Sequence, residues 1–328
     1  MKKLLLQLGI VIFLFPGFLF PQSHVYKVAD SINIGGKGWF DYASVDVPMH
    51  RLYLSHADLV NVIDLKTNKI IGEIDNLNGV HGIVFNDGLG KGFISNGRSD
   101  SVTVFDLHTF KIIGNIHVTG KDPDAIVYDP FTKRVFTMNG RSDNITAIDA
   151  ETDKVVGTIN LEGGPEFAVT NGKGLMFVNL ENKSKVVEFS PKTLKIIKTW
   201  SVTPGEGPSG LAIDIKNNIL FSGCHNKLMA ISNIETGKVI ATVPIGGHVD
   251  ACRYDSVTHL ALSSNGEGTL TVIKEISPKD FKVVQNLATE RGLRTMGLDT
   301  GTHSIYLPGM IVGKNNAKNF GVLILKKK

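Results

Sequence analysis

The chain repeats one pattern of residues about every 42 positions, a period typical of units built from four short strands. The first repeated position is an aspartate or asparagine that ends an apolar stretch and suits a tight turn. This position is occupied by Asp46, Asn86, Asp129, Asn171, Asp214, Asp255 and Asp299. Neighbouring units of such a repeat must stack to bury their apolar faces, so chain length alone does not set the number of domains.

Two further positions keep step with the first. An aromatic or aliphatic residue follows seven residues later, or six in the fourth repeat, and favours a strand centre. These residues are Tyr53, Phe93, Phe136, Phe177, Phe221, Leu262 and Tyr306. A lysine opens another apolar stretch at Lys69, Lys111, Lys154, Lys195, Lys238 and Lys282, and Lys27 continues the series backwards. In the third repeat, segments 125–128, 135–138, 145–148 and 154–159 predict one four-stranded antiparallel blade.

The two ends of the chain predict a closed ring. The last repeat holds three strand-like segments, 295–298, 304–307 and 320–325, and lacks a fourth. Segment 25–34 has the outer-strand pattern but no three strands before it. We expect it to complete the last blade, because closure covers sheet faces that an open solenoid would expose. The expected fold is all-β: a single seven-bladed β-propeller domain over residues 24–328.

The second strand of several repeats carries a recurring tetrapeptide. It occurs as Phe93-Ile94-Ser95-Asn96, Phe136-Thr137-Met138-Asn139 and Leu262-Ser263-Ser264-Asn265. With the third-strand segments 62–67 and 147–152, this pattern resembles the YVTN-repeat β-propeller family over essentially the whole chain after residue 23. Blades four and five depart from it, with Phe177-Val178-Asn179-Leu180 and Phe221-Ser222-Gly223-Cys224. The resemblance implies a propeller whose function gathers on one face.

Residues 1–23 are interpreted as a secretory signal peptide. Lys2 and Lys3 precede an apolar run from Leu4 to Phe20. Cleavage near Ser23 would leave no membrane span and place the protein in the periplasm or outside the cell. Since no clear Ala-x-Ala site follows, retention of the run as a membrane anchor stays open. No cysteine adjoins the run, so a lipid anchor on cysteine is not expected.

Charge and cysteine content argue against a polyanion-binding protein and against a disulfide-based scaffold. Loss of Lys2 and Lys3 lowers the formal net charge from +4 to +2, and binding to polyanions needs clustered positive charge. The seven spaced lysines open outermost strands, where charge discourages edge-to-edge pairing, so nucleic-acid binding is a minor alternative. Cys224 and Cys252 can form one disulfide, which cannot be the framework of a fold this size.

One further position in each repeat predicts a functional site. Five residues before the first repeated position stand Asp41, His81, Asp124, Glu166, Ser209, Asp250 and Arg294. We expect these side chains to surround the mouth of the central channel, where repelling carboxylates favour a cation or a cationic ligand. No cofactor is implied beyond a divalent cation held by some of His81, Asp124, Glu166 and Asp250. Arg294 is expected to pair with Asp250 or with an anionic group of a ligand. Bound water can satisfy the same ring.

The loops between second and third strands add candidates on the same face. The pentapeptide Asn-Gly-Arg-Ser-Asp occurs at 96–100 and 139–143. Asn-Gly accepts positive φ in tight turns, which explains most of the motif. It does not require arginine, so Arg98 and Arg141 are candidates for contact with an anionic ligand or partner. Trp39, His56, His225 and His248 are assigned to the same loop face.

No recognised catalytic motif is present. The sequence lacks Cys-x-x-Cys-His, a nucleophile elbow, a phosphate-binding glycine loop and His-Glu-x-x-His. The leading hypothesis is therefore an exported, non-enzymatic binding or scaffold protein for a small ligand or a protein partner. The alternative is a metal-assisted hydrolase or lyase at the channel mouth, with His81 or His248 as acid or base.

Overall fold

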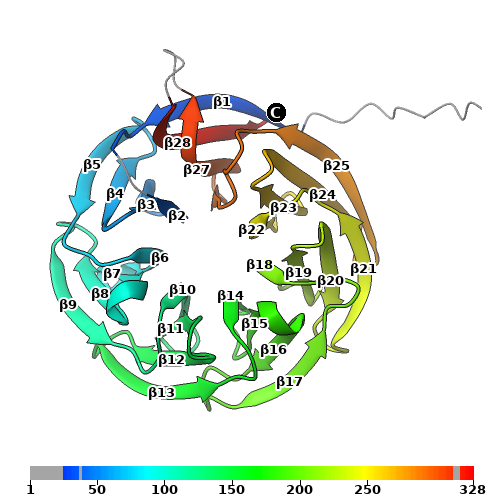
Figure 1. Ribbon diagram of the computed structural model, residues 1–328, viewed down its shortest axis with the longest axis horizontal. Helices are drawn as coiled ribbons and strands as arrows, with labels where there is room; N and C mark the ends of the chain where they lie inside the picture. Colours follow the sequence, from blue (N-terminus) through cyan, green and yellow to red (C-terminus); the bar gives the residue numbers. More distant parts are fainter. Residues whose placement is uncertain (1–24, 37–38, 313–317) are drawn as a thin grey trace, which may run out of the picture.

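The protein is a ring of seven sheets around a central channel (Figure 1). A computed structural model describes residues 25–36, 39–312 and 318–328. In this part of the chain there are 28 strands and three short 3-10 helices, and no α-helix. Each sheet has four antiparallel strands, and in six sheets these are consecutive in the sequence. The predicted all-β, seven-bladed propeller is confirmed.

In six blades the strands run outward from the channel in sequence order, and in the seventh β1 is the outermost strand (Figure 1). Blade 1 holds β2 (Phe40–Asp46), β3 (Arg51–His56), β4 (Leu59–Asp64) and β5 (Lys69–Ile74). Blade 2 holds β6 (Val80–Asn86), β7 (Lys91–Asn96), β8 (Ser101–Asp106) and β9 (Ile112–His117), with η1 (Asp87–Leu89) and η2 (Gly97–Ser99) in its turns. Blade 3 holds β10 (Pro123–Asp129), β11 (Arg134–Asn139), β12 (Asn144–Asp149) and β13 (Lys154–Asn160).

The other four blades follow the same plan. Blade 4 holds β14 (Pro165–Thr170), β15 (Met176–Leu180), β16 (Lys185–Phe189) and β17 (Ile196–Ser201), with η3 (Glu181–Lys183). Blade 5 holds β18 (Pro208–Asp214), β19 (Ile219–Cys224), β20 (Leu228–Asn233) and β21 (Lys238–Pro244). Blade 6 holds β22 (Val249–Asp255), β23 (Leu260–Asn265), β24 (Thr269–Ser277) and β25 (Asp280–Ala288). Blade 7 holds β26 (Gly297–Asp299), β27 (Ser304–Val312), β28 (Lys318–Lys327) and β1 (Tyr26–Asn33).

The first strand of the chain closes the ring. β1 pairs antiparallel with β28, with Tyr26 opposite Lys327 and Asn33 opposite Gly321. The side chain of Gln285 on blade 6 also holds β1, because its Oε1 accepts from Tyr26 N at 2.7 Å and its Nε2 donates to Tyr26 O at 2.8 Å. The predicted completion of the last blade by the N-terminal segment is confirmed, and the closing strand is bound both to β28 of its own sheet and to blade 6.

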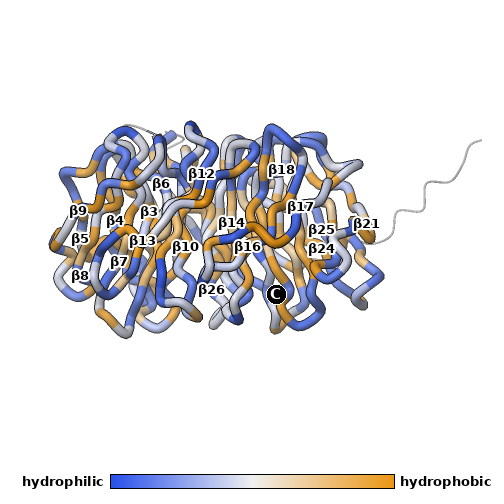
Figure 2. Tube along the Cα trace, turned by 90° about the horizontal axis from the view of Figure 1, so that it is seen from below, coloured by the Kyte–Doolittle hydropathy of each residue, from blue (hydrophilic) through white to orange (hydrophobic). Residues whose placement is uncertain are grey.

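The hydrophobic core lies between neighbouring blades. The second strand of each blade is covered on both faces, so aromatic residues at its centre, such as Phe93, Phe136 and Phe221, are fully buried. Phe93 shares one core cluster with Val135 and Ile148 of the next blade. Burial of such a side chain stabilises the fold by roughly 1.5–3 kcal/mol. Seen from the side, hydrophobic residues fill the middle of a flat disc and hydrophilic loops cover both faces (Figure 2).

A recurring turn links the third and fourth strands. Asp64 Oδ1 accepts hydrogen bonds from the backbone N of Lys66 and from both N and Oγ1 of Thr67. Asp106 with Thr109, and Asp149 with Thr152, repeat this geometry. These hydrogen bonds to the ionised form lower the pKa of all three aspartates. The Asp-x-x-Thr spacing therefore recurs because it closes the same turn.

Candidate functional site

The predicted ring of residues lines one cavity. We call it the mouth cavity; its volume is about 340 Å³. All seven predicted residues line it, together with Tyr42, Glu181, His225, His248 and Val249. Asp41, His81, Asp124, Glu166, Ser209 and Asp250 are each the second residue of an innermost strand, and Arg294 precedes β26. Counting along the repeat thus brings together residues from seven blades, while their role in binding stays a prediction.

A β-bulge positions these side chains. In all six strands the pairing register shifts directly after the first residue, as between Pro123 and Ile126 of β10. A bulge bends the strand and redirects a side chain. The same bend at the same step of each blade turns the second residue toward the channel axis. The polar side chains of these six strands therefore lie at a similar depth in the channel.

His81 is the centre of the charge network in the mouth cavity. Its Nδ1 donates to Asp41 Oδ2 at 2.6 Å and lies 3.6 Å from Asp124 Oδ1, while Nε2 lies 4.0 Å from Asp122 Oδ1. Burial by itself lowers the pKa of His81, but the hydrogen bond to Asp41 and the charges of the aspartates outweigh it and raise this pKa to about 9. His81 is therefore an imidazolium at neutral pH.

Two carboxyl groups of the cavity lack a strong partner. Glu166 makes no hydrogen bond or ion pair with the described residues, and Asp124 Oδ1 is buried without a hydrogen bond. Burial raises the pKa of both groups, and repulsion from neighbouring carboxylates adds to this effect. In this cavity five carboxyl groups outnumber Arg294 and the imidazolium of His81. When all five are ionised, the mouth is short of positive charge.

The opposite side of the mouth holds a more balanced pair. Arg294 Nε lies 3.0 Å from Asp250 Oδ2, and Ser209 Oγ donates to Asp250 Oδ1 at 3.1 Å. Burial raises the pKa of Asp250, and the guanidinium of Arg294 counteracts this shift. The expected Arg294–Asp250 pair is present. Asp124 and Glu166 are therefore the carboxyl groups of the cavity that nearby positive charge balances least.

The loop-face residues extend the network outward. The Trp39 and His81 rings lie 5.5 Å apart, and the Arg98 guanidinium lies 5.6 Å from the Trp39 ring centre. Arg98 also pairs with Asp58 at 3.6 Å. Arg141 Nε lies 2.9 Å from Asp122 Oδ2, so both predicted arginines already contact carboxylates of this chain. Their side chains remain 59% and 80% exposed.

The pentapeptide loops differ from the expected turn. Positive φ occurs at Asp100 and Asp143, not at Asn-Gly. Asn96 is extended and buried, and donates from Nδ2 to Thr103 Oγ1, so its amide is used to hold the strand pair. Asp100 accepts from the neighbouring blade through Lys121 Nζ and the backbone N of Asp122. The motif therefore recurs partly because it links adjacent blades.

The three assigned histidines separate into two groups. His225 and His248 line the mouth cavity, and His225 Nδ1 lies 3.2 Å from Glu181 Oε1. His56 does not lie in a loop: it is the last residue of β3, is 6% exposed, and its ring centre lies 4.0 Å from that of Phe320 with the two rings tilted by 38°. The assignment of His56 to a loop was wrong, because the residue belongs to a strand. Its ring is covered by Phe320 of the closing blade, a neighbour that is far away in the sequence.

Sequence reasoning missed Tyr42, Glu181 and Asp122. Glu181 follows β15 at the place that Gly97 and Gly140 take in their blades, so alignment of these loops would have found it. Asp122 stands two residues before Asp124. Tyr42 had no signal, since its reach into the channel depends on the bulge in β2.

One triad has the composition of a metal site. Ligand atoms of Asp41, His81 and Asp124 all lie within 4.8 Å of one another. Carboxylate oxygen and imidazole nitrogen are suitable ligands for a divalent ion. However, a ligating His81 must be neutral, and its ion pair with Asp41 favours the protonated form. A metal would have to displace that proton.

The lysine series and the cysteines lie away from the mouth. The seven lysines are exposed at or beside the starts of the outermost strands, around the rim (Figure 1). They form no single tract. Cys224 and Cys252 are free, fully buried thiols, and burial raises the pKa of both to about 12. Neither the seven lysines nor the two cysteines line the mouth cavity.

The predicted signal peptide, residues 1–23, lies outside the described residues. In the part of the chain that the structure describes, no helix has the length and apolarity needed to cross a membrane. A scan against protein-family models finds no match to this chain, and a search of curated proteins also finds none. The function is therefore inferred from the propeller fold and the mouth cavity alone.

Proposed function

We propose that this protein is a non-enzymatic binding protein whose mouth cavity holds a small cationic ligand. One observation carries the proposal: in the described residues Glu166 makes no ion pair, and Asp124 Oδ1 has no hydrogen bond and only a 3.6 Å contact with the His81 imidazolium that Asp41 already binds, among carboxylates from four blades. Interacting carboxylates in a partly desolvated cavity repel one another. A bound cation relieves that repulsion and regains part of the desolvation cost.

The dimensions of the cavity favour an organic cation. A volume of about 340 Å³ is at the lower end of the range of small-molecule pockets. Its walls come from the innermost strands of a closed ring, so they need little reorganisation on binding. Preorganised charges give affinity because the ligand does not have to order them. A small quaternary ammonium or amine fits this combination of size and charge.

A divalent metal ion is the second candidate, supported by the Asp41–His81–Asp124 triad. Such an ion would permit the hydrolase or lyase alternative, in which it lowers the pKa of a bound water. The two candidates respond differently to substitution. Glu166 lies outside the triad, so Glu166→Gln should weaken binding of an organic cation more than binding of a divalent ion.

Isothermal titration calorimetry with choline, tetramethylammonium, CaCl₂ and ZnCl₂ tests the proposal. We expect the organic cations to bind near pH 9, where Asp124 and Glu166 lose their protons, with affinity falling at least about tenfold in Glu166→Gln and Asp124→Asn, which corresponds to ~1.4 kcal/mol. Glu162→Gln is the matched control, because Glu162 pairs with Lys185 outside the mouth cavity. Absence of binding by both organic cations at millimolar concentration would reject the organic ligand, and stoichiometric metal lost in Asp124→Asn would favour the metal.

We also infer export of the protein, supported by the basic and apolar N-terminal sequence. Cell fractionation and N-terminal sequencing test this inference. A new N-terminus near Ser23 in an envelope or secreted fraction supports it. An intact Met1 in the cytosolic fraction contradicts it, and leaves the binding proposal unaffected.

A further inference from the structure

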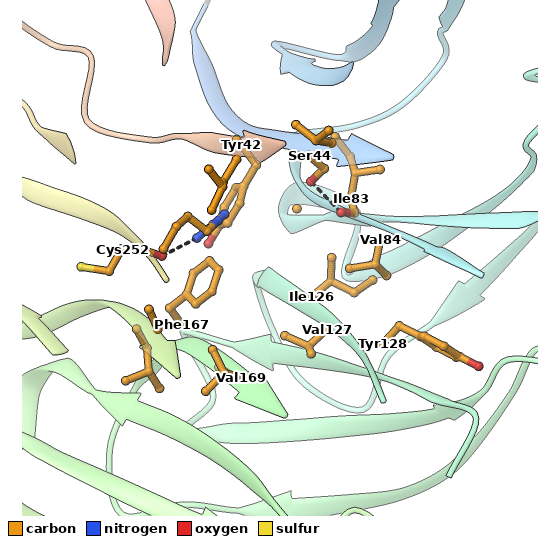
Figure 3. A pocket seen from close by; sticks show the side chains of 18 of the residues that line it. Tyr42, Ser44, Ile83, Val84, Ile126, Val127, Tyr128, Phe167, Val169 and Cys252 are labelled. Carbon is orange, nitrogen blue, oxygen red and sulfur yellow. Dashed lines mark hydrogen bonds between the residues drawn. The ribbon is translucent and has the colours of Figure 1, made fainter. Parts of the chain in front are cut away.

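A second cavity lies in the central channel beside the mouth cavity. We call it the channel cavity; its volume is about 510 Å³. Its walls are formed by the innermost strands, and Tyr42 borders both cavities. Figure 3 shows Ile126, Val127, Phe167 and Val169 around it. The lining continues toward the ends of the innermost strands that lie away from the mouth.

The walls of the channel cavity are almost free of charge. One residue of each innermost strand, two positions before the repeated aspartate or asparagine, lines the cavity. These residues are Ser44, Val84, Val127, Val169, Ala212, Arg253 and Gly297. No aspartate, glutamate, lysine or histidine is among the described residues of the lining. Arg253 is therefore an exception at a position that is otherwise small and neutral.

The guanidinium of Arg253 has few partners. It lies 4.9 Å from the ring centre of Phe167, whose ring stacks on that of Tyr42 at 6.0 Å. Its Nη1 donates to the backbone O of Cys252 at 2.8 Å. Within the described residues no carboxylate lies in ion-pair range of it, although the acidic mouth cavity is adjacent. Its other four N–H groups have no acceptor among the described residues.

A cationic group in this position can hold an anion. Arginine stays protonated in proteins, and the Arg253 side chain is half-buried, so a ligand in the channel can reach its remaining N–H groups. The planar guanidinium presents parallel N–H donors that match the two oxygens of a carboxylate. Aliphatic and aromatic walls match an apolar body. The acidic mouth repels such an anion, so it would enter from the opposite face of the disc.

We propose that the channel cavity binds a small monocarboxylate with an apolar body, with its carboxylate on Arg253. This site is separate from the mouth cavity and does not depend on the function proposed for it. The competing role for Arg253 is purely structural, through Phe167 and the Cys252 carbonyl. A structural role predicts a change in stability on substitution but no selective binding of an anion.

Isothermal titration calorimetry of the full chain with sodium octanoate tests the proposal, with 1-octanol and octylamine as neutral and cationic probes of equal chain length. We expect octanoate to bind at least ten times more tightly than either. Arg253→Met should reduce octanoate affinity at least tenfold, and Arg253→Lys should restore part of it. Arg98→Met is the matched control, because Arg98 lies on the mouth face and its loss should leave octanoate binding unchanged.

Several results would overturn the site. These are absence of octanoate binding at millimolar concentration, equal binding of octanol, or unchanged affinity in a folded Arg253→Met variant. If Arg253→Met does not fold, the affinities of the natural chain for the three probes still show whether the site selects a carboxylate. Glu166→Gln should leave octanoate binding intact, so failure of this site and failure of the mouth cavity are distinguishable.

Discussion

His81 Nδ1 donates a hydrogen bond of 2.6 Å to Asp41 Oδ2 on the neighbouring blade. This contact joins two innermost strands that are adjacent in the ring, and it makes His81 an internal counter-charge for the mouth. Because Asp122 and Asp124 also face His81, one imidazolium serves three carboxylates. The protonation of this single side chain should therefore affect stability and, under the proposed function, cation binding.

His81 should make a pH-dependent contribution to stability. Its folded-state pKa is raised from 6.5 to about 9, so its stabilisation is complete below the unfolded value and is lost as pH rises through about 9. We expect His81→Gln to lower the free energy of unfolding by roughly 1–3 kcal/mol near pH 6 and by much less near pH 10. Urea unfolding measures this. His108→Gln, in an exposed turn, should change little at either pH, and an equal loss for His81→Gln at both pH values contradicts the assignment.

The affinity for a permanent cation should increase with pH. Burial and carboxylate repulsion raise the pKa of Asp124 and Glu166, so these groups lose their protons only as pH rises toward and above neutrality. Deprotonation of His81 at higher pH acts in the same direction. We expect choline affinity to rise several-fold between about pH 6 and pH 9, and the slope to flatten in the Asp124→Asn, Glu166→Gln double variant. Calorimetry with choline, which does not titrate, measures this; a flat natural profile is the contrary result.

Loss of the Gln285 amide should weaken ring closure. This side chain satisfies both backbone polar groups of Tyr26, and Gln285→Ala leaves them buried without partners. We expect a loss of roughly 2–4 kcal/mol in the free energy of unfolding. The matched control is Asn286→Ala, because Asn286 is the exposed neighbour on the same strand. Equal urea midpoints for both variants would show that the amide does not hold β1.

Gly97 should be required for the geometry around His81. A Cβ at this position would meet Asp122 Oδ1 and lie 2.7 Å from His81 Nε2, whereas at Gly140 the nearest atom is 4.0 Å away. We expect Gly97→Ala to cost roughly 1–3 kcal/mol and to move the pKa of His81 toward 6.5, as measured by an NMR titration of the ring protons. Gly140→Ala should leave that titration unchanged. The idea fails if both variants titrate like the natural protein.

Much of the propeller could be predicted from periodicity. The positions occupied by Asp129 and Phe136 in the third repeat recur in every repeat. They identify the turn and the strand centre of each blade, because both are set by local sequence. The incomplete last repeat predicted that β1 would close the ring. The ring of mouth residues was also predictable, since equal steps along equivalent strands lead to equal depths in the channel.

Side-chain pairing across blades could not be predicted in the same way. His56 was assigned to the loop face, but Phe320 from the closing blade covers it. The place of Arg253 in an uncharged wall also became visible only when all seven innermost strands were together.

By itself the sequence determined the number of blades, the layer of each strand and the depth of each polar position, because these follow from spacing along one chain. Only the tertiary structure decided which charges meet, as His81 meets Asp41 and Arg253 meets no carboxylate in the described residues. The physical reason is that Coulomb and hydrogen-bond energies depend on distances of a few ångströms between blades. Those distances are set by bulges, loop paths and side-chain packing that a repeat period does not encode.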